Sequence, residues 1–296
     1  MADLDELDTF LDALARTSEA PDAAGFRARN RAIDELELHL GVERERPAAG
    51  ARIVALRDRM QAVNDSMARA LRERIAAGGI SSPDLLATFR DYVGAPRAGE
   101  RFGLEYDDLD ALVAGILSTD QLVEEAGVTW DPEMVPYQPT PARLILELLP
   151  ELRLSERDVF VDVGSGLGTV PALVSLLTPA RAVGIEWHPS YCAYARERVR
   201  ALNLSSVSFV QQDAREADFS GGTVFYMFTP FKGTMLRDVL QRLDREGRRR
   251  KLRLCVYGPL LRAALRSFSS FTTSAPSPGD VISVFESSGL GAVRAG

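Results

Sequence analysis

The chain has 296 residues, which is enough for one large α/β domain and a smaller second domain. Its hydrophobic content of 46% and charged content of 26% are typical of a globular protein and not of a disordered one. The formal net charge of -7 argues against a nucleic-acid backbone as the main partner. Two cysteines and two histidines are too few for a disulfide framework or a zinc cluster, so we expect no metal site.

The sequence also argues against a membrane protein. No apolar run reaches ~18 residues, the length that a spanning helix needs. Residues 1–6 are acidic and have no apolar core, which is not the pattern of a signal peptide. We therefore expect a cytoplasmic protein without a membrane partner.

The first 126 residues carry a helical pattern. Apolar residues recur at three- and four-residue spacings, most clearly over residues 51–77. Gly78-Gly79 ends that run, and Ser82-Pro83 begins the next helix with a capping serine and a proline in the first turn. A further helix is expected over residues 106–117. We predict an all-α N-terminal domain whose methionine and leucine stripe forms its core.

Residues 127–141 differ from the rest because they contain four prolines, which exclude a regular helix. We interpret this segment as a proline-rich linker into the domain of residues 142–296. Thr140-Pro141 is expected to open a helix that ends near Leu149, with the threonine as its cap.

From residue 158 onward, apolar β-rich runs alternate with helical runs. This alternation predicts a parallel sheet with helices on both faces. The last two strands have no helix between them, so they are expected to pair as a hairpin. The fold class is therefore α/β, with a doubly wound, mostly parallel seven-stranded sheet and a C-terminal antiparallel hairpin. The predicted strands cover residues 158–163, 182–186, 207–211, 223–228, 252–257, 271–274 and 281–286.

The most informative stretch is Gly164-Ser165-Gly166-Leu167-Gly168, which follows the first strand and precedes a helix. Glycines serve where the chain turns sharply and something must approach the bare backbone. The amides that begin the following helix can bind a ligand. A dinucleotide fingerprint needs its third glycine at position 169, which is a threonine, so this spacing disfavours a nicotinamide cofactor.

Ligands of open parallel sheets bind beyond the carboxyl ends of the strands. Three successive strands end in or near an acid, namely Asp162, Glu186 and Asp213. A carboxylate there can accept hydrogen bonds from two hydroxyls at once. The fourth and fifth strands end near Phe228 and Tyr257, which are expected to form either an aromatic wall or part of the core.

These residues together resemble the class I S-adenosylmethionine (SAM) dependent methyltransferases, which are Rossmann-like, over about residues 134–290. The resemblance implies SAM as the cofactor and S-adenosylhomocysteine as the product. It matches Asp162 and the three glycines to the first motif, Glu186 to the ribose-binding acid and Asp213 to the adenine-binding acid. Trp187 would then cover the adenine, and the Ala214 amide would donate to its ring.

A narrower resemblance is to the histone-lysine methyltransferases that lack a SET domain. It rests on Tyr137-x-x-Thr140 before a helix, on the glycine loop and on Gly-Ile-Glu186. It implies that Thr140 helps to hold the methionine end of SAM. The fourth strand departs from that family, because Thr229-Pro230-Phe231 replaces an Asn-Asn pair and lacks a side-chain acceptor for an amine.

The residues expected to bind the cofactor come from both resemblances and from the strand ends. Transfer from SAM is an in-line displacement, in which a base is needed only when the acceptor is protonated. No base is evident, and the candidates are His188, Thr229 and Tyr137. The cofactor-binding residues are Tyr137, Thr140, Asp162, Gly164, Ser165, Gly166, Gly168, Glu186, Trp187, Asp213, Ala214 and Thr229.

The sequence leaves the methyl acceptor open. We expect a SAM-dependent methyltransferase acting on a small molecule, with the N-terminal helical domain covering the substrate site. The first alternative is a protein-lysine methyltransferase of the non-SET kind. The second is a SAM-binding or scaffold protein without turnover. Nucleic acid is not favoured as a partner, and a homodimer stays open.

Overall fold

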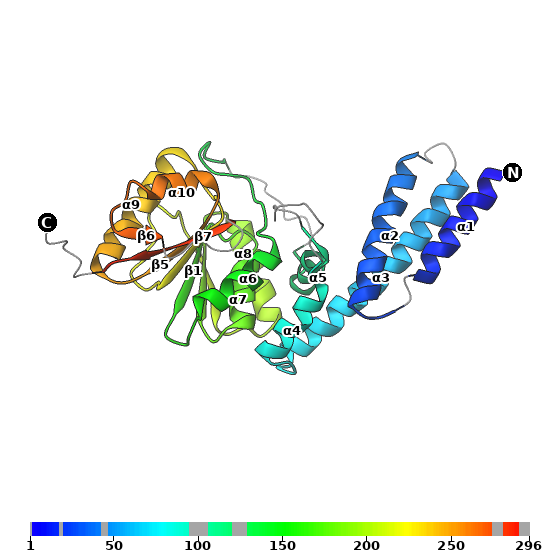
Figure 1. Ribbon diagram of the computed structural model, residues 1–296, viewed down its shortest axis with the longest axis horizontal. Coiled ribbons are helices and arrows are strands. Elements are labelled where there is room, and N and C mark those ends of the chain that lie inside the picture. The colour runs from blue at the N-terminus through cyan, green and yellow to red at the C-terminus, as the bar shows by residue number, and fades with distance from the viewer. Residues whose placement is uncertain are drawn as a thin grey trace.

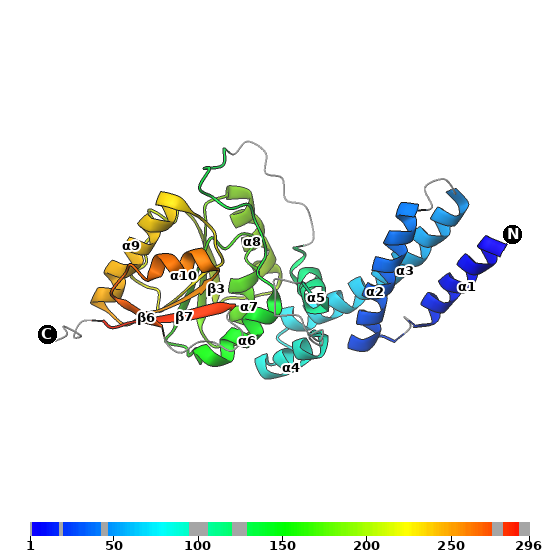
Figure 2. The ribbon, with the colours of Figure 1, turned by 45° about the horizontal axis from the view of Figure 1, so that its top comes forward.

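The computed structural model describes residues 2–17, 20–42, 47–94, 106–119, 129–273 and 281–289. Figures 1 and 2 show an α/β domain at one end of an elongated molecule and a group of three helices projecting from its other end. Within the described ranges, no helix has both the length and the hydropathy that crossing a membrane requires.

A seven-stranded sheet lies at the centre of the α/β domain, in the order β3-β2-β1-β4-β5-β7-β6. The first five strands pair in parallel, whereas β7 runs antiparallel to both β5 and β6. This confirms the predicted fold class, including the hairpin. The strands are β1 (Val159–Val163), β2 (Arg181–Glu186), β3 (Val207–Gln211), β4 (Val224–Met227), β5 (Arg253–Tyr257), β6 (Phe271–Thr273) and β7 (Ile282–Ser287).

Helices cover both faces of the sheet. Neighbouring residues of a strand point to opposite faces, so they pack against different helices. Phe225 and Tyr226 of β4 are both fully buried, yet they belong to two different apolar clusters. The Tyr226 cluster includes α6 and α7, and the Phe225 cluster includes α9 and α10. The helices of this domain are α6 (Ala142–Leu152), α7 (Thr169–Leu177), α8 (Pro189–Ala201), α9 (Gly233–Arg249) and α10 (Pro259–Leu265).

Within the described residues of the N-terminal region, the only regular secondary structure is helical. Helices α2 and α3 pair along their length and extend away from the sheet in both views. Helix α4 packs on α7, and α5 packs on α6, so one apolar cluster continues across the predicted boundary at residue 126. The helices are α1 (Ala2–Thr17), α2 (Ala23–Val42), α3 (Pro47–Ala76), α4 (Ser82–Tyr92) and α5 (Asp108–Leu117).

Helix α6 is capped differently from the sequence-based expectation. Its N-cap is Pro141, and the side chain of Thr140 makes no capping bond. The Thr140 hydroxyl instead lies 3.2 Å from the hydroxyl of Tyr226. The Ala142 amide, at the start of α6, donates to Asp110 of α5 at 2.7 Å, so another helix supplies the cap. The helix also runs past Leu149 to Leu152, with Pro150 inside it.

Asp110 therefore joins two helix starts. One of its oxygens accepts the Ala142 amide, and the other accepts the amide of Asp107, which is the N-cap of α5, at 2.8 Å. Burial raises the pKa of Asp110 to about 6, against an ordinary value of 3.8. The folded protein consequently holds this proton more tightly than the unfolded chain does.

We expect the substitution Asp110→Asn to flatten the dependence of stability on pH. In the wild type, the free energy of unfolding should fall as pH rises from about 4 to about 6, by roughly 2 kcal/mol, since each pKa unit corresponds to about 1.4 kcal/mol. Urea unfolding of both proteins across this range measures the difference. Equal slopes would show that Asp110 does not titrate in this way.

Candidate cofactor and acceptor site

A cavity of about 320 Å³ opens beyond the carboxyl ends of the parallel strands. It lies where the strand order reverses between β1 and β4, which is the usual ligand position in open α/β sheets. Five segments line it, namely 130–140, the glycine loop with the start of α7, the turn after β2, the turn after β4 and the turn after β5. The predicted residues among the lining are Tyr137, Thr140, Asp162, Gly164, Ser165, Gly166, Glu186, Trp187 and Thr229.

The glycine loop adopts left-handed backbone conformations that favour glycine. Gly164 has φ 85° and Gly166 has φ 52°. A Cβ atom at Gly166 would lie 2.3 Å from the Tyr137 ring, and one at Gly164 would lie 2.4 Å from Pro230. The backbone of the glycine loop is therefore in close contact with the side chains of Tyr137 and Pro230, and it also lines the cavity.

Glu186 is a buried structural acid as well as a cavity residue. Its Oε2 accepts the Gly166 amide at 2.7 Å, and its Oε1 accepts the His188 amide at 2.8 Å. Only 5% of the residue is exposed, so it is not a solvated charge at a strand end. Burial raises the pKa of Glu186, although the amide hydrogen bonds oppose that shift.

Asp162 is the residue before the last in β1, lines the cavity and is 4% exposed. Burial raises its pKa well above the ordinary value, and the negative charge of Glu186 raises it further. A buried carboxylate beside a second acid is costly to ionise unless a cation or hydrogen-bond donors compensate it. The pair Asp162 and Glu186 therefore favours a ligand that carries positive charge and hydroxyl groups.

The other polar groups of the cavity fit the same kind of ligand. Among the described lining residues, the acids are the only charged side chains, and no arginine or lysine is present to receive a pyrophosphate. The Ser165 hydroxyl is buried without a hydrogen-bond partner. A cationic cofactor with ribose hydroxyls, such as SAM, suits this donor and acceptor set, whereas a dinucleotide does not.

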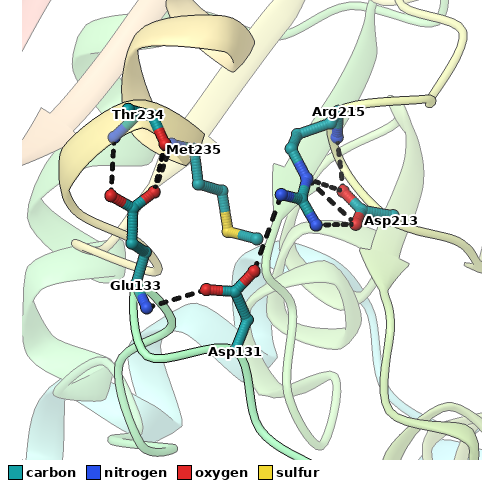
Figure 3. Close-up of polar contacts among 6 residues, drawn as sticks. All are labelled: Asp131, Glu133, Asp213, Arg215, Thr234 and Met235. Atoms are coloured by element: carbon teal, nitrogen blue, oxygen red, sulfur yellow. Dashed lines mark hydrogen bonds and ion pairs between the residues drawn. The ribbon is translucent and has the colours of Figure 1, made fainter.

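Three predicted cofactor residues, Gly168, Asp213 and Ala214, are not among the lining of the cavity. Gly168 faces the ring of Phe209, where a Cβ atom would lie at 2.5 Å. Both carboxylate oxygens of Asp213 accept hydrogen bonds from Arg215, as Figure 3 shows. This pairing lowers the pKa of Asp213.

None of the three candidate bases is arranged to remove a proton from an acceptor. His188 is fully buried and does not line the cavity. The Thr229 hydroxyl donates to the carbonyl of Tyr257 at 3.0 Å. Burial raises the pKa of Tyr137, so its phenol keeps its proton at neutral pH.

The part of the cavity beside the ends of β4 and β5 is apolar and aromatic. Phe228 and Tyr257 stack with ring centroids 4.4 Å apart, and both line the cavity together with Phe231. These rings therefore form a wall, which was one of the two expectations. Sequence reasoning missed Trp130, Met134 and Leu260 in this lining. The only signal for the first two was their place in the proline-rich segment.

Comparison with known proteins agrees with this geometry. Residues 160–248 match a family model described as a methyltransferase domain. This chain contains a methyltransferase domain. The predicted enzyme class and the predicted cofactor, SAM, are thereby confirmed at the level of the domain. None of the curated proteins compared with the chain matches it in sequence.

Several solved structures are similar to part of this chain. An RNA methyltransferase from Salinibacter ruber, in complex with S-adenosyl-L-homocysteine, is 23% identical and has a TM-score of 0.40. The similarity covers 50% of this chain and 92% of that one. A precorrin-6y C5,15-methyltransferase from Geobacter metallireducens is 18% identical, with a TM-score of 0.40, and the similarity covers 53% of this chain and 92% of that one.

We expect Asp162→Asn to change stability and cofactor affinity in opposite senses. Without ligand, the variant should melt about 2–4 °C higher, because about 1 kcal/mol of buried-charge cost is removed. Its affinity for SAM should fall about tenfold, since a hydrogen bond to a charged group contributes about 1.5–3 kcal/mol. Thermal melts and calorimetry measure the two effects.

Asp158→Asn is the matched control, because Asp158 begins β1 at the far end and its carboxylate lies 3.2 Å from Arg253. Its pKa is lowered by hydrogen bonds from Ser155 and Thr223 and by the charge of Arg253, which outweigh the effect of burial. This variant should melt lower than the wild type and bind SAM equally well. A fall in melting temperature for both variants would contradict the assignment of Asp162.

Proposed function

We propose that this protein transfers a methyl group from SAM to a small, uncharged acceptor. The observation that carries the proposal is the composition of one cavity. Its inner part has the glycine loop and two buried acids, and its other part is lined by Phe228, Phe231 and Tyr257. Among the described residues at that second part, no side chain is charged, so a charged acceptor would lose its hydration without compensation.

The proposed cofactor contacts follow from the lining. The carboxylate of Glu186 accepts amides of the glycine loop and of the turn after β2, and we assign its remaining lone pairs to the ribose hydroxyls. We assign Asp162 and Ser165 to the polar methionine end together with Thr140 and Tyr137, and we assign Trp187 to the adenine. The roles of Gly168 and Ala214 are confined to shaping the loops behind the cavity.

Positioning and exclusion of water are the main contributions of the protein to the reaction. Bound SAM supplies a methyl group that its sulfonium charge already activates. The aromatic wall holds the acceptor in line and keeps water out, which accounts for a large part of such accelerations. Because no candidate base is arranged to act, we infer that the acceptor loses its proton to solvent or needs no proton removal.

A protein-lysine acceptor is the second candidate. The placement of Tyr137 and Thr140 in the cavity favours it, because this spacing resembles the non-SET lysine methyltransferases. Against it, the Thr229 hydroxyl is already bonded to Tyr257 and the strand end offers no carboxylate or amide to an amine. A SAM-binding protein without turnover is the third candidate, which only an assay separates.

We further propose that the N-terminal region acts through α5. The hydroxyl of Tyr106 donates to the carbonyl of Pro139 at 2.8 Å. Tyr106, Ala111 and Thr119 line a second cavity of about 280 Å³ that shares Tyr137 and Thr140 with the first. In this proposal α5 supports the wall beside the cofactor, while α1–α3 lie away from it (Figure 1).

We expect SAM to bind with roughly micromolar affinity, about 8 kcal/mol, and NAD not to bind. Calorimetry with both ligands tests the cofactor. An assay of S-adenosylhomocysteine formation with separate metabolite, protein and nucleic-acid pools then tests the acceptor. Activity with the metabolite pool alone is the expected result, and activity confined to the protein pool would favour the lysine candidate. Binding of NAD without SAM would contradict the whole proposal.

A further inference from the structure

Residues 130–137 line one side of the cavity and contain a turn in which the Met134 amide donates to the Asp131 carbonyl at 2.9 Å; we call this segment the strap. Its backbone pairs with the turn after β4, where the Val135 amide donates to the Pro230 carbonyl at 3.1 Å. The Lys232 amide donates back to the Glu133 carbonyl at 2.9 Å. The strap supplies Trp130, Met134, Val135, Pro136 and Tyr137 to the lining.

Glu133 fixes one part of the strap to the start of α9. Its carboxylate accepts the amide of Thr234 at 2.9 Å, the hydroxyl of Thr234 at 2.7 Å and the amide of Met235 at 2.7 Å (Figure 3). Free amides at a helix start bind and stabilise a negative charge. These bonds lower the pKa of Glu133 to about 2, so its carboxylate is charged at neutral pH.

Arg215 holds the other part of the strap. Its guanidinium binds both oxygens of Asp213 and reaches to 3.6 Å from the carboxylate of Asp131 (Figure 3). Asp131 also accepts the amide of Glu133 at 2.9 Å, so the two attachments are connected. Asp213, which was expected to bind adenine, is therefore the anchor of this arginine.

The closed strap also carries an energetic cost. The ring of Trp130 stacks on His188 with centroids 5.7 Å apart. His188 is fully buried, and neither of its ring nitrogens has a hydrogen-bond partner. Unpaired buried polar groups oppose the arrangement that buries them. Displacement of Trp130 would let water reach the imidazole. The attachments through Glu133 and Arg215 therefore favour the position of the strap seen here, whereas the unpaired imidazole opposes it.

We propose that the strap closes over the bound cofactor, and that Glu133 and Arg215 are the positioning residues that hold it closed. The inference rests on the proposed function, since it requires SAM in the cavity. Loss of an attachment then accelerates the release of SAM, and removal of the unpaired imidazole slows it. Entry of SAM is less affected, because changes at one binding surface act mainly on dissociation.

The test compares Glu133→Ala with Asp218→Ala as a matched control. Asp218 is likewise an exposed carboxylate that accepts a backbone amide, from Ser220 at 2.9 Å, but it lies outside the strap and the cavity. We expect Glu133→Ala to raise the dissociation rate and the Kd of SAM about tenfold, with the association rate changed less than about twofold. The control should stay within about twofold of the wild type on all three measures.

Tryptophan fluorescence reports on the environment of Trp130, and therefore on the position of the strap. Trp130 and Trp187 are the only tryptophans in the sequence, and their ring centroids lie 5.2 Å apart. Without SAM, Glu133→Ala should show a red-shifted emission, because Trp130 becomes hydrated, and saturating SAM should reverse the shift. An emission equal to that of the wild type would overturn the proposal.

A second variant tests the opposing cost. His188→Phe keeps an aromatic ring for Trp130 and removes the unpaired nitrogens, so the dissociation rate of SAM should fall. If the wild type binds SAM and Glu133→Ala behaves like the control, the strap has no such role and the proposed function still stands. If the wild type does not bind SAM, the proposed function fails, and this inference fails with it.

Discussion

The carboxylate of Glu186 connects the parts of the candidate site. It lies at the end of β2, yet it accepts an amide of the glycine loop after β1 and an amide of the turn that begins α8. The glycine loop and the turn from β2 to α8 therefore keep their relative positions through one buried acid. Because its charge also acts on Asp162, the same residue sets the electrostatics of the cavity and its preference for a cationic ligand.

A second buried acid has a comparable role away from the cavity. Asp110 of α5 provides the cap that α6 lacks in its own sequence. The apolar cluster around α4, α5, α6 and α7 is continuous, so these two N-terminal helices are part of the structure that supports the sheet. Helices α1–α3 extend away from the sheet and share a smaller cluster around Leu36, Ile53 and Met60, although the end of α3 also joins the larger cluster through Leu71 and Ile75.

Uncommon backbone conformations shape the part of the cavity beside the ends of β4 and β5. Thr229 has φ 50°, and Gly258 has φ 99° directly after β5. These turns bring Phe228 and Tyr257 into contact, and they occupy the Thr229 hydroxyl with a backbone carbonyl. Strained turns of this kind are common at functional sites, because there geometry matters more than local stability.

The sequence by itself determined the strands, the glycine loop and the acids at the ends of β1 and β2. These signals are local, since a run of β-branched residues, a glycine spacing and a helical period each extend over a few neighbours. The spacing of Gly164, Gly166 and Gly168, taken together with the acids at the strand ends, favoured SAM over a dinucleotide.

Only the tertiary structure decided what the acids and the proline-rich segment do. Asp213 lies where the resemblance places an adenine-binding acid, and only the structure shows that both of its oxygens accept hydrogen bonds from Arg215. Residues 127–141 read as a linker, yet Glu133 binds the start of α9 across a separation of 102 residues. Such contacts depend on how distant segments meet, and no local period or propensity records them.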